Sequence, residues 1–165
     1  MTLEELLAKY EVAELRLAYS AYIDCGDFER LANLFTEDAV CDFGPEYGRW
    51  EGRATIRTNY EAAMKPVGGP FDALHIVTNP FVTLTGPDTA HARWYLIDCL
   101  TRQAPVTGLS TRGGHGSPFL WLGMYEDQCV RRDGVWRIQH TQLHFLWPER
   151  PGDRIEATAE RLRGM

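Results

Sequence analysis

The apolar residues of this 165-residue chain change their spacing near Phe71. Before that point they recur at helical intervals, as in residues 3–18, and after it they lie in long runs typical of β-strands. Gly86-Pro87-Asp88 separates the first two runs, and Asp133-Gly134, a strong signal for a tight hairpin, separates the last two. Helices followed by antiparallel hairpins predict an α+β domain.

The same patterns predict individual elements. Asp27 is a suitable cap for a second, short helix, and Pro66 ends a third one over residues 52–65. A curved antiparallel sheet wrapped around these N-terminal helices, a cone-shaped α+β barrel, would bury both sets of apolar faces and enclose a pocket. We expect residues 1–147 to form this domain.

Two further segments have a composition unlike the strands. Residues 103–118 are rich in Gly, Ser, Thr and Pro, which predicts a surface loop that could act as a lid over the pocket. Residues 148–165 form a tail with a helical pattern near its end. We expect that tail either to close the pocket or to contact a neighbouring subunit.

Composition excludes some functions and sets a default location. The formal net charge of -6 argues against a nucleic-acid partner, because phosphate binding requires clustered Lys and Arg. No apolar run approaches the ~20 residues of a membrane span, and the acidic N-terminus does not look like a signal peptide. We therefore expect a cytoplasmic protein with no membrane partner, whose four scattered cysteines are reduced.

Four segments together resemble a known family. They are LAYSAYIDCGDFERLANLFTEDAV, GRATIR, LHIVTNPFV and YEDQCVRRDGVWRIQH, and they follow one another in the order typical of the SnoaL-like branch of the nuclear transport factor 2-like superfamily. The resemblance extends over residues 3–147. It implies the cone-shaped fold, but no single reaction, since the superfamily includes dehydratases, isomerases, cyclases, a dehydrochlorinase and non-catalytic binding proteins.

Within that superfamily the chain is most similar to cofactor-free lyases, such as bile-acid 7α-dehydratase, scytalone dehydratase and hexachlorocyclohexane dehydrochlorinase. The resemblance implies an Asp at the end of the first helix and a His on the strand after the third helix, which are Asp24 and His75 here. It also implies a Tyr five residues before that Asp, here Tyr19, and a second Asp on the following strand, here Asp98. It implies no cofactor.

The chemistry of these side chains supports elimination. A neutral imidazole with an ordinary pKa near 6.5 is a usable base, so His75 could remove a proton beside a carbonyl. Asp24 could accept the ring N–H and fix the tautomer. Tyr19 or Tyr22 could donate to the oxygen that becomes negative, and Asp98 could steer the base or donate when protonated.

Each residue also has a structural interpretation. Asp24 is equally suited to ending a helix, His75 to a satisfied position in a sheet, and Asp98 to a buried ion pair. The two tyrosines also fit simple core packing.

The final strand and the aromatic residues supply candidates for the pocket wall. Trp136, Ile138, His140, Gln142 and His144 share one parity, so His140 and His144 would line the cavity if the first two face the core and no bulge intervenes. Trp50 and Trp121, together with Tyr22, are further candidates for contacting substrate. Such a pocket suits a small, apolar, cyclic or aromatic molecule. No H-x-H or H-E-x-x-H spacing predicts a metal site.

The sequence thus predicts a cofactor-independent lyase that catalyses a dehydratase-type elimination. Two alternatives remain open: an isomerase or polyketide cyclase that uses the same base, and a non-catalytic small-molecule-binding domain. Alternation in the strands would also leave Trp94 or Tyr95 and Trp121 or Leu122 on the outer face of the sheet, which favours self-association. The family resemblance implies a trimer or a dimer, and the lyases named favour the trimer.

Overall fold

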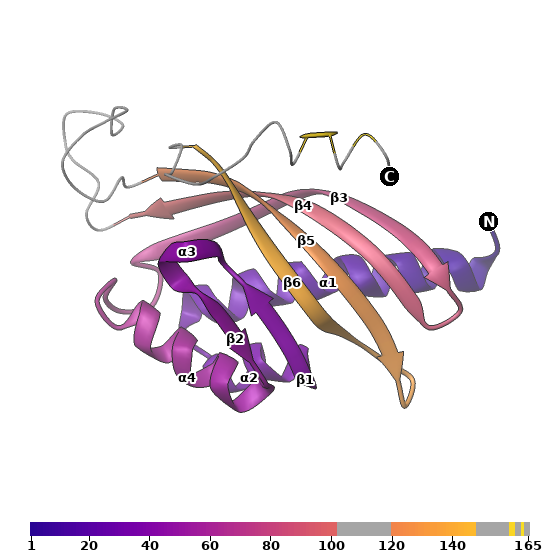
Figure 1. Cartoon of the computed structure of the whole chain (residues 1–165), viewed down its shortest axis with the longest axis horizontal. Coiled ribbons are helices and arrows are strands. Elements are labelled where there is room, and N and C mark those ends of the chain that lie inside the picture. Colours follow the sequence, from indigo (N-terminus) through magenta and orange to yellow (C-terminus); the bar gives the residue numbers. More distant parts are fainter. Residues whose placement is uncertain (102–119, 148–158, 161–162, 164–165) are drawn as a thin grey trace.

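The structure, a computed structural model, describes residues 1–101, 120–147, 159–160 and 163 (Figure 1). The proposed lid, residues 103–118, and nearly all of the tail, residues 148–165, lie outside the described residues. The helices are α1 (Leu3–Cys25), α2 (Phe28–Asn33), α3 (Gly44–Tyr47) and α4 (Arg53–Met64). The strands are β1 (Phe35–Asp42), β2 (Arg49–Glu51), β3 (Ala73–Gly86), β4 (Thr89–Leu100), β5 (Leu120–Arg132) and β6 (Val135–Trp147).

The strands form one six-stranded sheet with the order β2-β1-β6-β5-β4-β3. This confirms the predicted α+β class with a curved sheet and N-terminal helices. Two details differ from the prediction. The pairing of β1 with β6 is parallel, and the sheet is open, with β2 and β3 at its edges.

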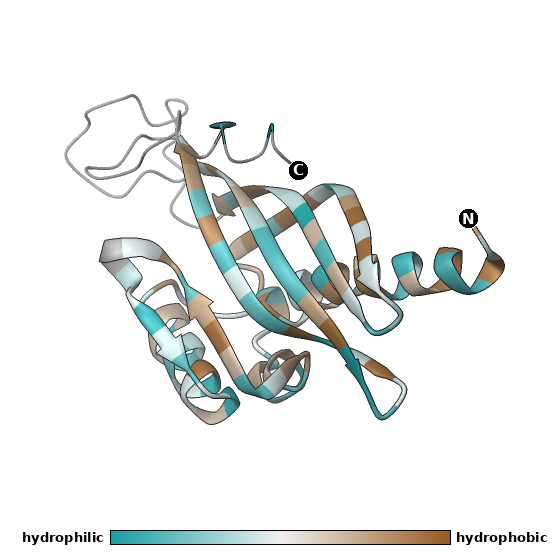
Figure 2. Ribbon diagram, turned by 45° about the vertical axis from the view of Figure 1, so that its right-hand side comes forward, coloured by the Kyte–Doolittle hydropathy of each residue, from teal (hydrophilic) through white to brown (hydrophobic). Residues whose placement is uncertain are grey.

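Helix α1 lies across the inner face of the sheet, against β3, β4 and β6 (Figure 1). Apart from the adjacent pairs Leu15–Arg16 and Ile23–Asp24, its buried residues recur every three or four positions, which places most of them in one stripe along the helix. Along the strands, hydrophobic and hydrophilic residues alternate, so that one face of the sheet packs on the helix (Figure 2). The buried stripe consists of Ala8, Val12, Leu15, Arg16, Tyr19, Ile23 and Asp24.

The turns have the conformations that their residues favour. Asp133 and Gly134 both have positive φ, 55° and 76°, the combination that a two-residue hairpin turn requires. Asp27 caps α2 by accepting a hydrogen bond from the backbone of Arg30. Between β1 and β2 the chain turns through the short helix α3, which begins at Gly44-Pro45.

A bulge bends β3 near its middle. Thr78 pairs with Tyr95, but the next paired residue is Phe81 with Arg93, and Asn79 between them has φ 54°. Such an irregularity increases local twist and curves the strand. The first half of β3 therefore follows α1 closely, and it carries His75 on the helix-facing side.

No helix in the described part of the chain is both long enough and apolar enough to cross a bilayer.

Candidate active site

Asp24 lies in the last turn of α1 and is buried. The helix stops two residues later, at Gly26, whose φ of 79° is the left-handed conformation that commonly follows a helix C-terminus. The Asp24 carbonyl oxygen accepts a hydrogen bond from the backbone N–H of Phe71, at 2.7 Å. The segment that leads into β3 is thereby attached to the end of α1.

The Asp24 carboxylate binds His75 in two ways. Its Oδ1 lies 2.7 Å from His75 Nδ1, and both carboxylate oxygens accept the backbone N–H of His75, at 3.0 and 3.1 Å. Because a carboxylate is an acceptor, it fixes the neutral imidazole as the tautomer that carries its proton on Nδ1. The opposite nitrogen, Nε2, then has a free lone pair.

Asp98 stands on the other side of the imidazole. It is the direct cross-strand partner of His75 between β3 and β4, and its Oδ2 lies 3.9 Å from His75 Nε2. The Asp98 side chain is partly exposed, whereas those of His75 and Asp24 are buried. The structure thus brings together Asp24, His75 and Asp98, three of the four residues singled out for catalysis in the sequence.

The two carboxylates set the basicity of the ring. Burial lowers the pKa of His75, but the hydrogen bond to Asp24 and the negative charge of Asp98 outweigh it. The net pKa of His75 lies above its ordinary value of 6.5. The ring is therefore a stronger base than a free histidine, and its protonated form is stabilised.

Tyr19 is the fourth predicted residue, and it lies beside the imidazole. Its ring meets that of His75 edge to face, with centroids 6.4 Å apart. Its hydroxyl donates to that of Tyr60, at 3.1 Å, and lies 3.3 Å from that of Tyr125. Burial raises the pKa of all three phenols well above 10, so each is a neutral hydrogen-bond donor at physiological pH.

Beneath this phenol cluster lies a buried ion pair that the sequence analysis missed. The guanidinium of Arg16 binds Asp127 with two nitrogens, at 2.8 and 2.6 Å, and also donates to Thr141. It stacks on the rings of Tyr19 and Tyr125, 4.5 and 3.8 Å from their centroids. The periodicity of the two elements could have indicated the pair, since Arg16 falls on the buried stripe of α1 and Asp127 on the inward side of β5.

The predicted aromatic contacts occupy different places. Trp50 is buried and packs edge to face on Tyr60, one ring away from Tyr19. Trp121 is the cross-strand partner of Asp98 and so shares its face of the sheet. Tyr22 is half-buried at the margin of the core, with the Arg30 guanidinium 6.0 Å from its ring centroid.

The prediction that His140 and His144 face the cavity is wrong. Ile138 is buried and pairs with Cys129, but the next pair joins His140 to Gln128, so Gln139 is an extra residue that reverses the parity of β6. Thr141, which contacts Arg16, therefore faces inward, and its neighbours along the strand face outward. His144 Nε2 instead lies 3.0 Å from the Glu126 carboxylate on the outer face.

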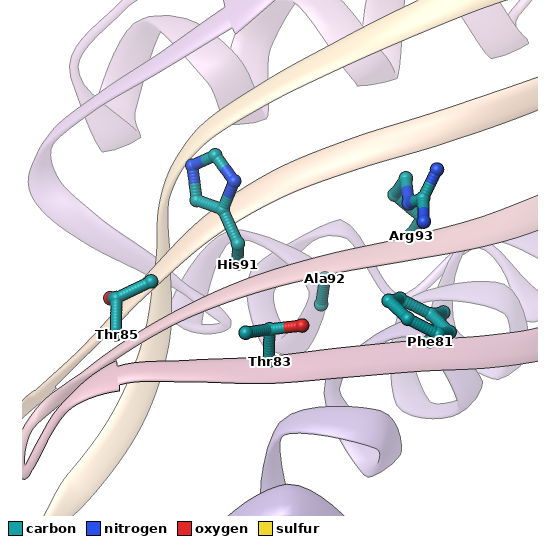
Figure 3. A pocket seen from close by; sticks show the side chains of 6 residues that line it. All are labelled: Phe81, Thr83, Thr85, His91, Ala92 and Arg93. Atoms are coloured by element: carbon teal, nitrogen blue, oxygen red, sulfur yellow. The ribbon is translucent and has the colours of Figure 1, made fainter. Parts of the chain in front are cut away.

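The described residues also form an open groove of about 210 Å³ on β3 and β4 (Figure 3). Its lining includes Phe81, His91 and Arg93, which lie on the face of the sheet opposite His75 and Asp98. The groove is therefore separate from the Asp24–His75 pair. Within the described ranges, no three His, Cys, Asp or Glu side chains come together as metal ligands.

The sequence also matches a known protein family. A model of the SnoaL-like domain matches residues 4–142, which is most of the chain. The chain belongs to the SnoaL-like domain family. No curated protein that was compared with the sequence matches it.

Solved structures similar to this SnoaL-like domain share its fold. A candidate scytalone dehydratase from Novosphingobium aromaticivorans is 21% identical, with a TM-score of 0.72 over 94% of this chain and 97% of that one. LinA is 17% identical, with a TM-score of 0.71 over 88% and 90% of the two chains. A form of Rv3472 from Mycobacterium tuberculosis, of unknown function, is 25% identical, with a TM-score of 0.68 over 86% and 73%.

Proposed function

We propose that this SnoaL-like domain is a cofactor-independent lyase that eliminates water from a small, apolar, cyclic or aromatic substrate. The observation that carries the proposal is the buried contact of 2.7 Å between His75 Nδ1 and Asp24. A contact of this kind leaves Nε2 as a base and stabilises the imidazolium that forms when it takes a proton. The neighbours named for a dehydratase and, in another LinA structure, for a hexachlorocyclohexane dehydrochlorinase support an elimination.

The reaction follows from these positions. His75 Nε2 removes a proton from the carbon next to a substrate carbonyl, and the electrons of that C–H bond form an enolate. The enolate then collapses to a carbon–carbon double bond conjugated with the carbonyl, and the hydroxyl on the adjacent carbon leaves. The proton held by His75 passes to that departing hydroxide, so the products are the unsaturated ketone and water.

The other residues of the site have supporting roles in the proposal. Asp24 holds the ring and balances the charge that develops on it. Asp98, 3.9 Å from Nε2, stabilises the same positive charge from the other side. Tyr19 is kept protonated by its raised pKa, and it would donate to the substrate oxygen by turning its O–H away from Tyr60.

The test is His75→Gln assayed with a panel of β-hydroxy ketones and polycyclic alcohols. We expect kcat/KM to fall about 10²–10⁴-fold, the usual contribution of a general base. His91→Gln is the matched control, since that histidine lies on the outer groove, and its activity should be unchanged. Loss of less than tenfold in the His75 variant would show that another group removes the proton.

Product analysis separates elimination from the alternative chemistry. An isomerase or cyclase can use the same base, but its enolate is quenched by protonation or by carbon–carbon bond formation. Mass spectrometry of the product therefore decides between them: elimination removes the mass of one water, whereas isomerisation leaves the mass unchanged.

A further inference from the structure

Helix α1 carries a second apolar stripe, on its exposed side. Leu3, Leu6, Tyr10, Ala13 and Leu17 follow one another at alternating intervals of three and four residues. The four large side chains are exposed, 73% for Leu3, 49% for Leu6, 62% for Tyr10 and 48% for Leu17, whereas Ala13 is half-buried. This is the spacing of the first and fourth positions of a heptad, the seam by which two helices pack together.

The exposed stripe faces away from the core. At about 100° per residue, its five members centre on the side of α1 roughly opposite the buried stripe that contains Val12 and Tyr19. The first turns of α1 also extend past the ends of the strands (Figure 2). A second helix could therefore lie along this side without meeting the sheet of the same subunit.

The area of this surface fits a small specific interface. Together with Leu7, which is 53% exposed beside it, the stripe offers apolar surface of the order of 500 Å² per chain. Two copies would bury about 1,000 Å², the lower limit for a specific interface.

The charges beside the stripe indicate which partner fits it. Lys9 and Glu14 lie on its two sides, five residues apart. In a parallel, in-register pair of α1 helices, Lys9 of each chain faces Glu14 of the other, so the interface contains two attractive pairs. An antiparallel pair would instead bring each residue toward its own kind, which is repulsive.

We propose that α1 is a dimerisation element, on which a second copy of this chain packs its own α1 in parallel. The two helices form the centre of the dimer, and the two sheets lie on its outside. This differs from association through the outer face of the sheet, where Tyr95 and Leu122 are exposed, because the contact is made by the helix on the other side of the domain.

Disulfide trapping tests the geometry directly. Leu6→Cys is made in a Cys25→Ser background, because Cys25 is the exposed native thiol among the described residues. In the proposed pair the two new thiols face each other within disulfide reach, so mild oxidation should give a covalent dimer in high yield. Glu4→Cys, one turn from the N-terminus but off the seam, is the matched control and should remain largely monomeric on denaturing gels.

Self-association in solution provides a second readout. Sedimentation equilibrium of the unmodified full chain should show a dimer, and Leu6→Glu should raise its dissociation constant about 100-fold or more. Lys9→Glu and Glu14→Lys should each weaken the dimer several-fold, about 3–10-fold, and the double charge swap should restore it. Circular dichroism verifies that each variant is folded.

Three results would overturn the proposal. One is a chain that stays monomeric at about 100 μM, far above the dissociation constant of a specific dimer. Another is equal cross-linking of the Leu6 and Glu4 cysteine variants. The third is an oligomer that dissociates with Tyr95→Lys, on the outer face of the sheet, but is unaffected by Leu6→Glu.

Discussion

Arg16 and Asp127 are 111 positions apart in the chain and form a fully buried ion pair with two hydrogen bonds. The pair joins the middle of α1 to β5, and its guanidinium stacks on Tyr19, whose ring also meets that of His75. Both ions have lost their hydration, and in its place Arg16 Nε and Nη2 bind Asp127 and Thr141, whereas Arg16 Nη1 has no hydrogen-bond partner among the described residues. The pair is thus one of the contacts that hold α1 against the sheet.

Removing one member of this pair should be costly, whereas removing both should not. Arg16→Met leaves the Asp127 carboxylate buried without its counter-charge, and we expect the free energy of unfolding to fall by about 3–5 kcal/mol. The double variant Arg16→Met, Asp127→Leu removes both charges and should recover most of that loss. Urea unfolding followed by circular dichroism measures both. Equal losses in the single and double variants would show that the unpaired buried charge of Asp127 is not the cause of the loss.

Asp24→Asn should show whether the Asp24 carboxylate sets the tautomer of His75 or only stabilises the fold. The amide has nearly the same shape, but it can donate to Nδ1 and so stabilise the tautomer that carries its proton on Nε2. We expect kcat to fall at least 100-fold with little change in KM, because Nε2 then carries a proton and cannot act as the base, while the binding surface is preserved. Asp27→Asn, at the cap of α2, is the control and should keep full activity. A purely structural Asp24 would instead affect stability and leave kcat intact.

The raised pKa of His75 predicts a pH profile. The base is active only when deprotonated, so kcat/KM should rise with pH and level off above an apparent pKa higher than 6.5. Because the charge of Asp98 contributes to the upward shift, Asp98→Asn should move the rising limb to lower pH. A limb that does not move would show that the kinetic pKa belongs to another group.

The same shift predicts how stability depends on pH. The folded protein holds the His75 proton more tightly than the unfolded chain, whose His75 has a pKa near 6.5. The resulting stabilisation is fully present below pH 6.5 and disappears as the pH rises through the folded-state pKa. His75→Gln should lack this part of the dependence when denaturant midpoints are measured from pH 5 to 9, with His91→Gln as the control.

The end of α1 depends on a residue that tolerates left-handed backbone. A Cβ at Gly26 would meet nothing within 4 Å, so the cost of Gly26→Ala arises from its φ of 79° alone. We expect Gly26→Ala to lower the free energy of unfolding by about 1 kcal/mol, and Gly26→Asn by less, since Asn adopts this conformation more readily. Thermal denaturation provides the comparison. Equal effects of Ala and Asn would indicate a steric rather than a backbone cause.

Much of the fold follows from local sequence. The tight turn at Asp133-Gly134 and the cap at Asp27 are where their residues predict them, and β3 ends at Gly86, where Gly86-Pro87-Asp88 predicts a turn. The proximity of Asp24 and His75 was also foreseen, but through the family resemblance rather than through spacing. Their part in catalysis remains a proposal.

Only the tertiary structure decided which side chains share the interior with His75. One extra residue at Gln139 turned His140 and His144 to the outer face, although the alternation of the sequence predicted the inner one. The Arg16–Asp127 pair likewise depends on how α1 crosses a strand more than one hundred residues away. Local residues set backbone conformation and turns, since those forces act between near neighbours. Strand register and helix placement come from packing across the whole sheet, and they determine which face each side chain occupies.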